Sequence, residues 1–150
     1  MRIYLDCCCY NRPFDMQSNR TIAFETTAKM LVQQWVMEEQ VELVDSFVLR
    51  EELSGITNEQ KLGIIYQFID DNANVFIASD KAAEVLALAG DIMSEGIKYM
   101  DASHLACAIV SKANYFLTTD KRILKYKGSL INVINPIDFV RMQEEQNDEL

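Results

Sequence analysis

Four acidic residues stand where the sequence changes between strand-like and helix-like patterns. Asp6 follows a short β-prone segment, Asp120 follows another, and Asp101 opens a helical pattern just before that second segment. The fourth is Glu52, on the helix expected to leave the second strand, and its neighbour Glu51 is an equally placed alternative. Carboxylate oxygens suit Mg²⁺ or Mn²⁺, and such an ion can activate water and orient a phosphodiester. Because carboxylates in close contact repel each other without a cation, a cluster of these acids would imply a metal and a phosphate substrate.

Each acid also has a simpler explanation. An Asp between a strand and a helix is a preferred N-cap, so Asp101 and Asp120 can be caps alone. Glu52 can simply face water. Asp6 is harder to explain in this way, because it ends an apolar strand and a buried carboxylate needs a partner. The four residues are far apart in the chain, so only the fold can unite them.

The elements that would position these acids alternate between strand and helix. Apolar patterning predicts strands at residues 2–6, 41–45, 75–77, 115–118 and 129–134. It predicts helices at 18–40, 46–53, from Thr57 (a capping box), 79–96, 101–113, 120–127 and from Pro136. We expect the first helix to bury Phe24, Ala28, Leu31 and Trp35.

This alternation predicts an α/β fold with three layers, α/β/α, around a central, mostly parallel sheet of about four to five strands. In such sheets the active crevice lies beyond the carboxyl ends of the strands, where the acids stand. The length of 150 residues fits one domain, which we place at residues 1–140, followed by an acidic, frayed tail at 141–150.

Composition adds expectations about surroundings. The longest apolar run, 105–110, is far shorter than the roughly 20 residues that cross a bilayer, so we expect no membrane span. Asp6 interrupts any early signal-peptide stretch. Three of the four cysteines are consecutive, Cys7 to Cys9, and no C-x-x-C pair exists. These features favour a cytoplasmic protein with reduced thiols.

The net charge argues against bulk binding of nucleic acid. The chain carries 14 basic and 23 acidic residues, a formal charge of −9. A nucleic-acid ligand would then depend on metal ions that reverse the sign locally.

Four motifs resemble those of the PIN-domain nucleases, most closely the bacterial VapC-type toxins. They are Ile3-Tyr-Leu-Asp6, Ser46-Phe-Val-Leu-Arg-Glu-Glu52-Leu53, Asp101-Ala-Ser-His-Leu-Ala106 and Phe116-Leu-Thr-Thr-Asp120. The resemblance implies that Asp6, Glu52, Asp101 and Asp120 bind metal and catalyse, with Thr118 supporting them. It further implies a Mg²⁺-dependent endoribonuclease, the toxin of a type II toxin–antitoxin pair, that forms a homodimer and is inhibited by a small protein antitoxin. The chain departs from the family at Cys7, where many members carry Thr or Ser.

Other residues are weaker candidates for supporting the site or for contacting RNA. His104 shares a helix face with Asp101 and can bond to it, or can be merely structural. Asn11 lies in the loop after Asp6 and is a further supporting candidate. Candidate RNA contacts are Arg12, Lys121, Arg122 and Lys125, although the basic run 121–127 can equally be a solvated helix face.

Two rival functions are open. A non-catalytic PIN-fold interaction protein would share the fold without the activity. A receiver-type phosphorylation switch would use Asp45 and Lys121, which are less convincingly placed.

Overall fold

The centre of the molecule is a five-stranded parallel sheet. The computed structural model describes residues 1–148. Its strands are β1 (Arg2–Leu5), β2 (Glu42–Ser46), β3 (Val75–Ile77), β4 (Tyr115–Leu117) and β5 (Asn132–Ile134), in the order β3-β2-β1-β4-β5. The prediction of an α/β sheet with parallel strands is confirmed.

The strand order creates a crevice at one place. The chain runs outward from β1 through β2 to β3 and then crosses back to place β4 on the other side of β1. The carboxyl ends of β1 and β4 therefore flank the point where the strand order reverses, and α/β proteins bind ligands at such points. Just beyond the two strands, the Asp6 N–H donates a hydrogen bond of 2.9 Å to the Leu117 carbonyl.

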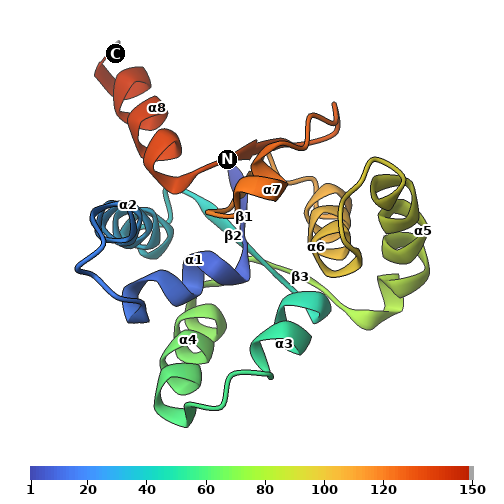
Figure 1. Ribbon diagram of the computed structural model, residues 1–150, viewed down its shortest axis with the longest axis horizontal. Helices are drawn as coiled ribbons and strands as arrows, with labels where there is room; N and C mark the ends of the chain where they lie inside the picture. The colour runs from blue at the N-terminus through green and yellow to red at the C-terminus, as the bar shows by residue number, and fades with distance from the viewer. Residues whose placement is uncertain (149–150) are drawn as a thin grey trace.

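Helices cover both faces of this sheet. Figure 1 shows α5 (Ala82–Met93) and α6 (Tyr99–Val110) on one side of it, and α2 (Arg20–Met37) and α8 (Pro136–Asp148) on the other. The remaining helical elements are α1 (Cys7–Asn11), η1 (Arg12–Phe14), α3 (Phe47–Leu53), α4 (Glu59–Asn72), η2 (Ser79–Lys81) and α7 (Lys121–Leu124). No helix in the described part of the chain is long and apolar enough to span a membrane.

The core is built from strands that are apolar on both faces. Ile3, Leu5, Leu43 and Phe116 are fully buried, as expected for a parallel sheet packed between helices. The Tyr4 ring stacks on Phe116 at a centroid distance of 5.3 Å. This packing fixes the carboxyl ends of β1 and β4 relative to each other.

The expected buried face of α2 is right only in part: Ala28 is buried, and Leu31 and Trp35 are half-buried. Phe24 is 63% exposed, and the buried residues are Glu25, Ala28, Lys29, Val32 and Val36. The two charged residues are tolerated because they have partners: Glu25 binds Arg12 and Asn135, and Lys29 lies over the rings of Tyr10 and Phe68. The spacing of apolar residues in the sequence does not predict these contacts.

Several element boundaries also differ. The polar loop expected after Asp6 is the short helix α1, and α4 is capped by Asn58 rather than by Thr57. The acidic tail expected to fray at 141–150 instead continues α8 as far as Asp148, and residues 149–150 lie outside the described part.

Candidate metal centre

Asp6 is held rigidly at the carboxyl end of β1. It caps α1 by accepting a hydrogen bond of 2.8 Å from the Cys7 N–H on Oδ1, while Oδ2 accepts one of 2.8 Å from the Thr118 hydroxyl. The Cys8 thiol donates to the same Oδ2 at 3.4 Å. Thr118 in turn accepts from the Asp120 N–H at 3.1 Å, so β1 and β4 are joined through one carboxylate.

Glu52 enters the same crevice from α3. Its Oε2 lies 2.7 Å from His104 Nε2. Ligand atoms of Asp6, Glu52 and His104 all lie within 4.8 Å of one another. Glu51, its neighbour, is exposed, so the structure brings Glu52 and not Glu51 to Asp6.

A buried chain of polar side chains supports Glu52. The Tyr4 hydroxyl lies 2.6 Å from His104 Nδ1 and 2.7 Å from Ser46 Oγ. Ser46 Oγ accepts from the Leu49 N–H at 3.0 Å as the N-cap of α3. The arrangement that satisfies every group has Ser46 donating to Tyr4, Tyr4 donating to Nδ1, and Nε2–H donating to Glu52.

Among the described residues, Asp101 and Asp120 are not part of this close group of ligand atoms, although the charges of Asp6, Asp120 and Glu52 act on Asp101. Both Asp101 and Asp120 are half-buried. Asp120 is the N-cap of α7, accepting from the Arg122 N–H at 2.8 Å. Asp101 is no cap, because α6 begins at Tyr99 and its N-cap position is Lys98. The simple capping explanation therefore fits Asp120 but not Asp101.

Charge repulsion connects these acids. Burial raises the pKa of Asp6, and the Glu52 charge adds to the increase, although His104 and Thr118 oppose it. The pKa of Asp101 is raised by burial and then by the charges of Asp6 and Asp120. The hydrogen bond from His104 lowers the pKa of Glu52. Burial works against ionisation of Asp120, but the Arg122 N–H and guanidinium lower its pKa overall.

This donor set fits a hard divalent cation. The carboxylates of Asp6, Glu52, Asp101 and Asp120 supply oxygen atoms, the ligands that Mg²⁺ and Mn²⁺ prefer. Burial and, to a smaller extent, neighbouring carboxylates raise the pKa values of Asp6 and Asp101, and a bound cation would favour their ionised forms. His104 is fully buried with both ring nitrogens engaged, so we assign it to orienting Glu52 rather than to binding metal.

The other candidates are placed less centrally. His104 bonds Glu52, and no hydrogen bond joins it to Asp101 within residues 1–148. Asn11 reaches the centre only indirectly, through a contact of 3.8 Å from its amide nitrogen to Cys7 Sγ. Arg12 is occupied by Glu25 and Asp15, at 2.9 and 2.8 Å.

Sequence reasoning missed Tyr4 and Ser46. Their signal was a hydroxyl side chain inside or at the end of an otherwise apolar strand, where a buried polar group must find a partner. Asp45, the acceptor that a receiver-type switch would need, is instead bound by the Arg50 guanidinium at 2.8 Å.

Comparison with known proteins gives structural likeness and no sequence match. The chain matches no protein-family profile and no curated protein. Among solved structures, VapBC2 from Rickettsia felis, bound to a DNA fragment from their promoter, matches with a TM-score of 0.56 and 12% identity over 90% of this chain and 98% of that one.

Two further structures are similar. FitAcB from Neisseria gonorrhoeae gives a TM-score of 0.50 at 19% identity, covering 89% of this chain and 97% of that one. FitAB bound to an IR36 DNA fragment also gives 0.50 at 19% identity, over 90% and 95% of the two chains. The chain thus has the fold of the VapC-type PIN domains.

Proposed function

We propose that this protein is a metal-dependent endoribonuclease that hydrolyses RNA phosphodiester bonds. The observation that carries the proposal is the meeting of Asp6 and Glu52 at the carboxyl ends of the sheet, within 4.8 Å at their nearest ligand atoms. The charges of Asp6, Asp120 and Glu52 act on Asp101. Support comes from the PIN fold, in which the resemblance of the motifs assigns these same four positions to metal binding.

Asp6, Glu52, Asp101 and Asp120 would hold Mg²⁺ or Mn²⁺. A bound ion supplies Lewis-acid chemistry, which activates water and offsets charge on the phosphate. Thr118 and the Cys7 N–H keep both oxygens of Asp6 in place. His104 keeps the Glu52 carboxylate oriented and ionised, because its hydrogen bond lowers the pKa of that group.

In this reaction Glu52 orients the attacking water and accepts its proton. The water oxygen attacks phosphorus in line with the leaving oxygen, and the bond from phosphorus to the ribose O3′ breaks. O3′ takes up a proton from solvent, so the products carry a 5′-phosphate and a 3′-hydroxyl. His104, which is fully buried, contacts Glu52, and Tyr4 contacts His104 in turn.

We further propose that the protein is a cytoplasmic toxin held inactive by a small protein antitoxin, and that it acts as a homodimer. Support comes from the motifs that resemble the VapC-type toxins and from the structural likeness to VapBC2 and FitAcB. Co-expression with a candidate antitoxin from the neighbouring reading frame, followed by sizing of the purified complex, tests the partner and the stoichiometry together.

The activity is tested with wild-type protein, a labelled RNA and added Mg²⁺. We expect Asp6→Asn, Asp101→Asn and Asp120→Asn each to lower the cleavage rate by more than about 100-fold, which exceeds the loss usual for a residue that only orients a metal ligand. Glu51→Gln is the matched control, because Glu51 is exposed next to Glu52, and should cleave at the wild-type rate. If the protein is instead a non-catalytic interaction protein with this fold, neither the wild type nor any variant will show Mg²⁺-dependent cleavage.

A further inference from the structure

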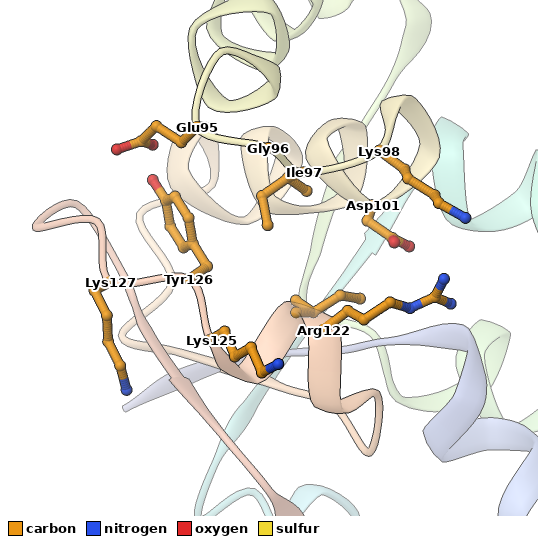
Figure 2. A pocket seen from close by; sticks show the side chains of 10 residues that line it. Glu95, Gly96, Ile97, Lys98, Asp101, Arg122, Lys125, Tyr126 and Lys127 are labelled. Carbon is orange, nitrogen blue, oxygen red and sulfur yellow. The ribbon is translucent and has the colours of Figure 1, made fainter.

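A pocket opens directly beside the acid cluster. It has a volume of about 490 Å³ and lies between the turn before α6 and the segment formed by α7 and the residues after it. Figure 2 shows Asp101, Lys98 and Arg122 at one end of the pocket, and Tyr126 with Glu95 at the other. Asp101 lines this pocket, and the charges of Asp6, Asp120 and Glu52 act on its carboxylate, so an occupant of the pocket lies next to the proposed metal centre.

The pocket is positive in a protein that is strongly negative. Its wall carries Lys98, Arg122, Lys125 and Lys127 against Glu95 and Asp101, whereas the whole chain has a formal charge of −9. Within residues 1–148, Arg122 pairs with Asp120 at 3.4 Å, and none of the three lysines makes an ion pair. Concentrated, unpaired ammonium groups beside a cluster of acids favour an anionic ligand, such as a phosphate backbone.

The wall also offers an aromatic ring. Tyr126 is half-buried, and burial followed by the nearby Glu95 charge raises its pKa, so it stays neutral at physiological pH. The ring occupies space that only glycine leaves open: a Cβ on Gly128 would lie 2.0 Å from the Tyr126 hydroxyl oxygen and 2.3 Å from Cζ. Gly128 therefore allows the ring to lie against the backbone at the pocket wall.

Cations and an aromatic surface together define the ligand more narrowly than charge alone. A free phosphate or an acidic side chain needs only the cations. Single-stranded nucleic acid needs both, because its backbone follows basic groups while its bases stack on aromatic rings.

We propose that this pocket binds one nucleotide of single-stranded RNA next to the phosphodiester bond that is cut. Lys98 and Lys125 contact the backbone phosphate and the Tyr126 ring stacks on the base. This proposal rests on the proposed function and extends it from the reacting phosphate to a neighbouring subsite. The pocket wall includes Arg122, Lys125 and Lys127 from the predicted basic run 121–127. It adds Lys98 and does not include Lys121.

Binding can be measured without cleavage in the Asp6→Asn background. The probe is a short, uracil-rich single-stranded RNA with a fluorescein label, and the readout is its Kd by fluorescence anisotropy over a range of salt concentrations. We expect Tyr126→Ala to weaken binding about 5- to 150-fold, whereas Tyr126→Phe binds as well as its parent. Gly128→Ala adds no pocket group but displaces the ring, and should weaken binding as Tyr126→Ala does.

The charge contribution has its own control. The double variant Lys98→Gln/Lys125→Gln should bind the RNA probe more weakly. Its slope of log Kd against log salt concentration should be lower by about 0.7 for each lysine removed. Lys112→Gln removes the same charge from an exposed turn before β4, at the opposite end of the sheet, and should leave the Kd and the slope unchanged.

Three results would overturn the subsite: no binding of the probe, equal weakening by the Lys112 variant, or unchanged binding by Tyr126→Ala. Circular dichroism of each variant checks that the fold is intact. The cleavage assay of the wild-type protein reads the proposed function separately. If the wild-type protein cleaves RNA but the pocket variants bind the probe unchanged, only the proposed subsite is contradicted. If the pocket variants bind more weakly but the wild-type protein does not cleave, only the proposed nuclease activity is contradicted.

Discussion

His104 contacts Glu52 from a fully buried position. Its Nε2 lies 2.7 Å from Glu52 Oε2, and its Nδ1 lies 2.6 Å from the Tyr4 hydroxyl oxygen. The choice between Glu51 and Glu52 is made by His104, which is far away in the sequence, so no local pattern could decide it.

The His104 contact predicts a difference between two substitutions. In His104→Gln the side-chain amide can place its N–H near the position of Nε2 and still donate to Glu52. In His104→Asn the amide reaches only the position of Nδ1, so the hydrogen bond to Glu52 is lost. We expect the Asn variant to lower Mg²⁺-dependent cleavage about 10- to 100-fold and to need more Mg²⁺ for half-maximal rate, with the Gln variant closer to wild type. Equal Mg²⁺ curves for the two variants would show that His104 is only structural.

At the scale of elements, the alternation of strand and helix was predictable, and so was the edge of the sheet that carries the acids. Apolar strands flanked by caps such as Ser46 and by Pro136 follow local rules. The face that α2 buries was only partly predictable, because Ala28 is buried as expected and Phe24 is not. It depends on Glu25 and Lys29, whose partners lie on η1, α1, α4 and the residue before α8.

The buried Lys29 side chain lowers the stability of the folded state by an amount that depends on pH. Burial lowers the pKa of Lys29 to about 8, from an ordinary 10.5. The folded state therefore binds this proton less tightly than the unfolded state, and this contribution makes folding more favourable as pH rises from about 8 to about 10.5. Below pH 8 both states are protonated and the full cost applies.

Replacing Lys29 with Met should remove this cost. We expect Lys29→Met to raise the free energy of unfolding at pH 7 by about 1–3 kcal/mol, because an apolar side chain of similar length fills the same space. The gain should shrink as pH rises through the range from about 8 to about 10.5. Urea unfolding of both proteins across this range measures it, and a gain that stays constant with pH would contradict the assignment.

At the scale of the whole molecule, the negative charge is arranged rather than uniform. The net charge of −9 excludes non-specific electrostatic binding of RNA over the whole surface. The fold places the acids of the crevice and the positive pocket at the same edge of the sheet, where the proposed function would confine RNA binding. Composition alone indicates the first fact, and only the fold reveals the second.

Metal binding should stabilise the entire fold. A ligand that binds only the folded state stabilises it by mass action, by about 2.7 kcal/mol at a hundredfold excess over its Kd. We expect Mg²⁺ or Mn²⁺ to raise the Tm of the wild-type protein but not that of Asp6→Asn. Sodium chloride at matched ionic strength controls for general screening. An equal rise in both proteins would place the ion somewhere other than the acid cluster.

The central claim is that carboxylates at the carboxyl ends of β1, α3 and β4 form one metal-dependent catalytic centre. The most direct measurement is the rate at which wild type, Asp6→Asn and Glu51→Gln cleave the same single-stranded RNA with Mg²⁺ and with EDTA. We expect cleavage by wild type and Glu51→Gln in Mg²⁺, none in EDTA, and a loss of more than about 100-fold in Asp6→Asn. Cleavage by Asp6→Asn at the wild-type rate, or cleavage that persists in EDTA, would contradict it.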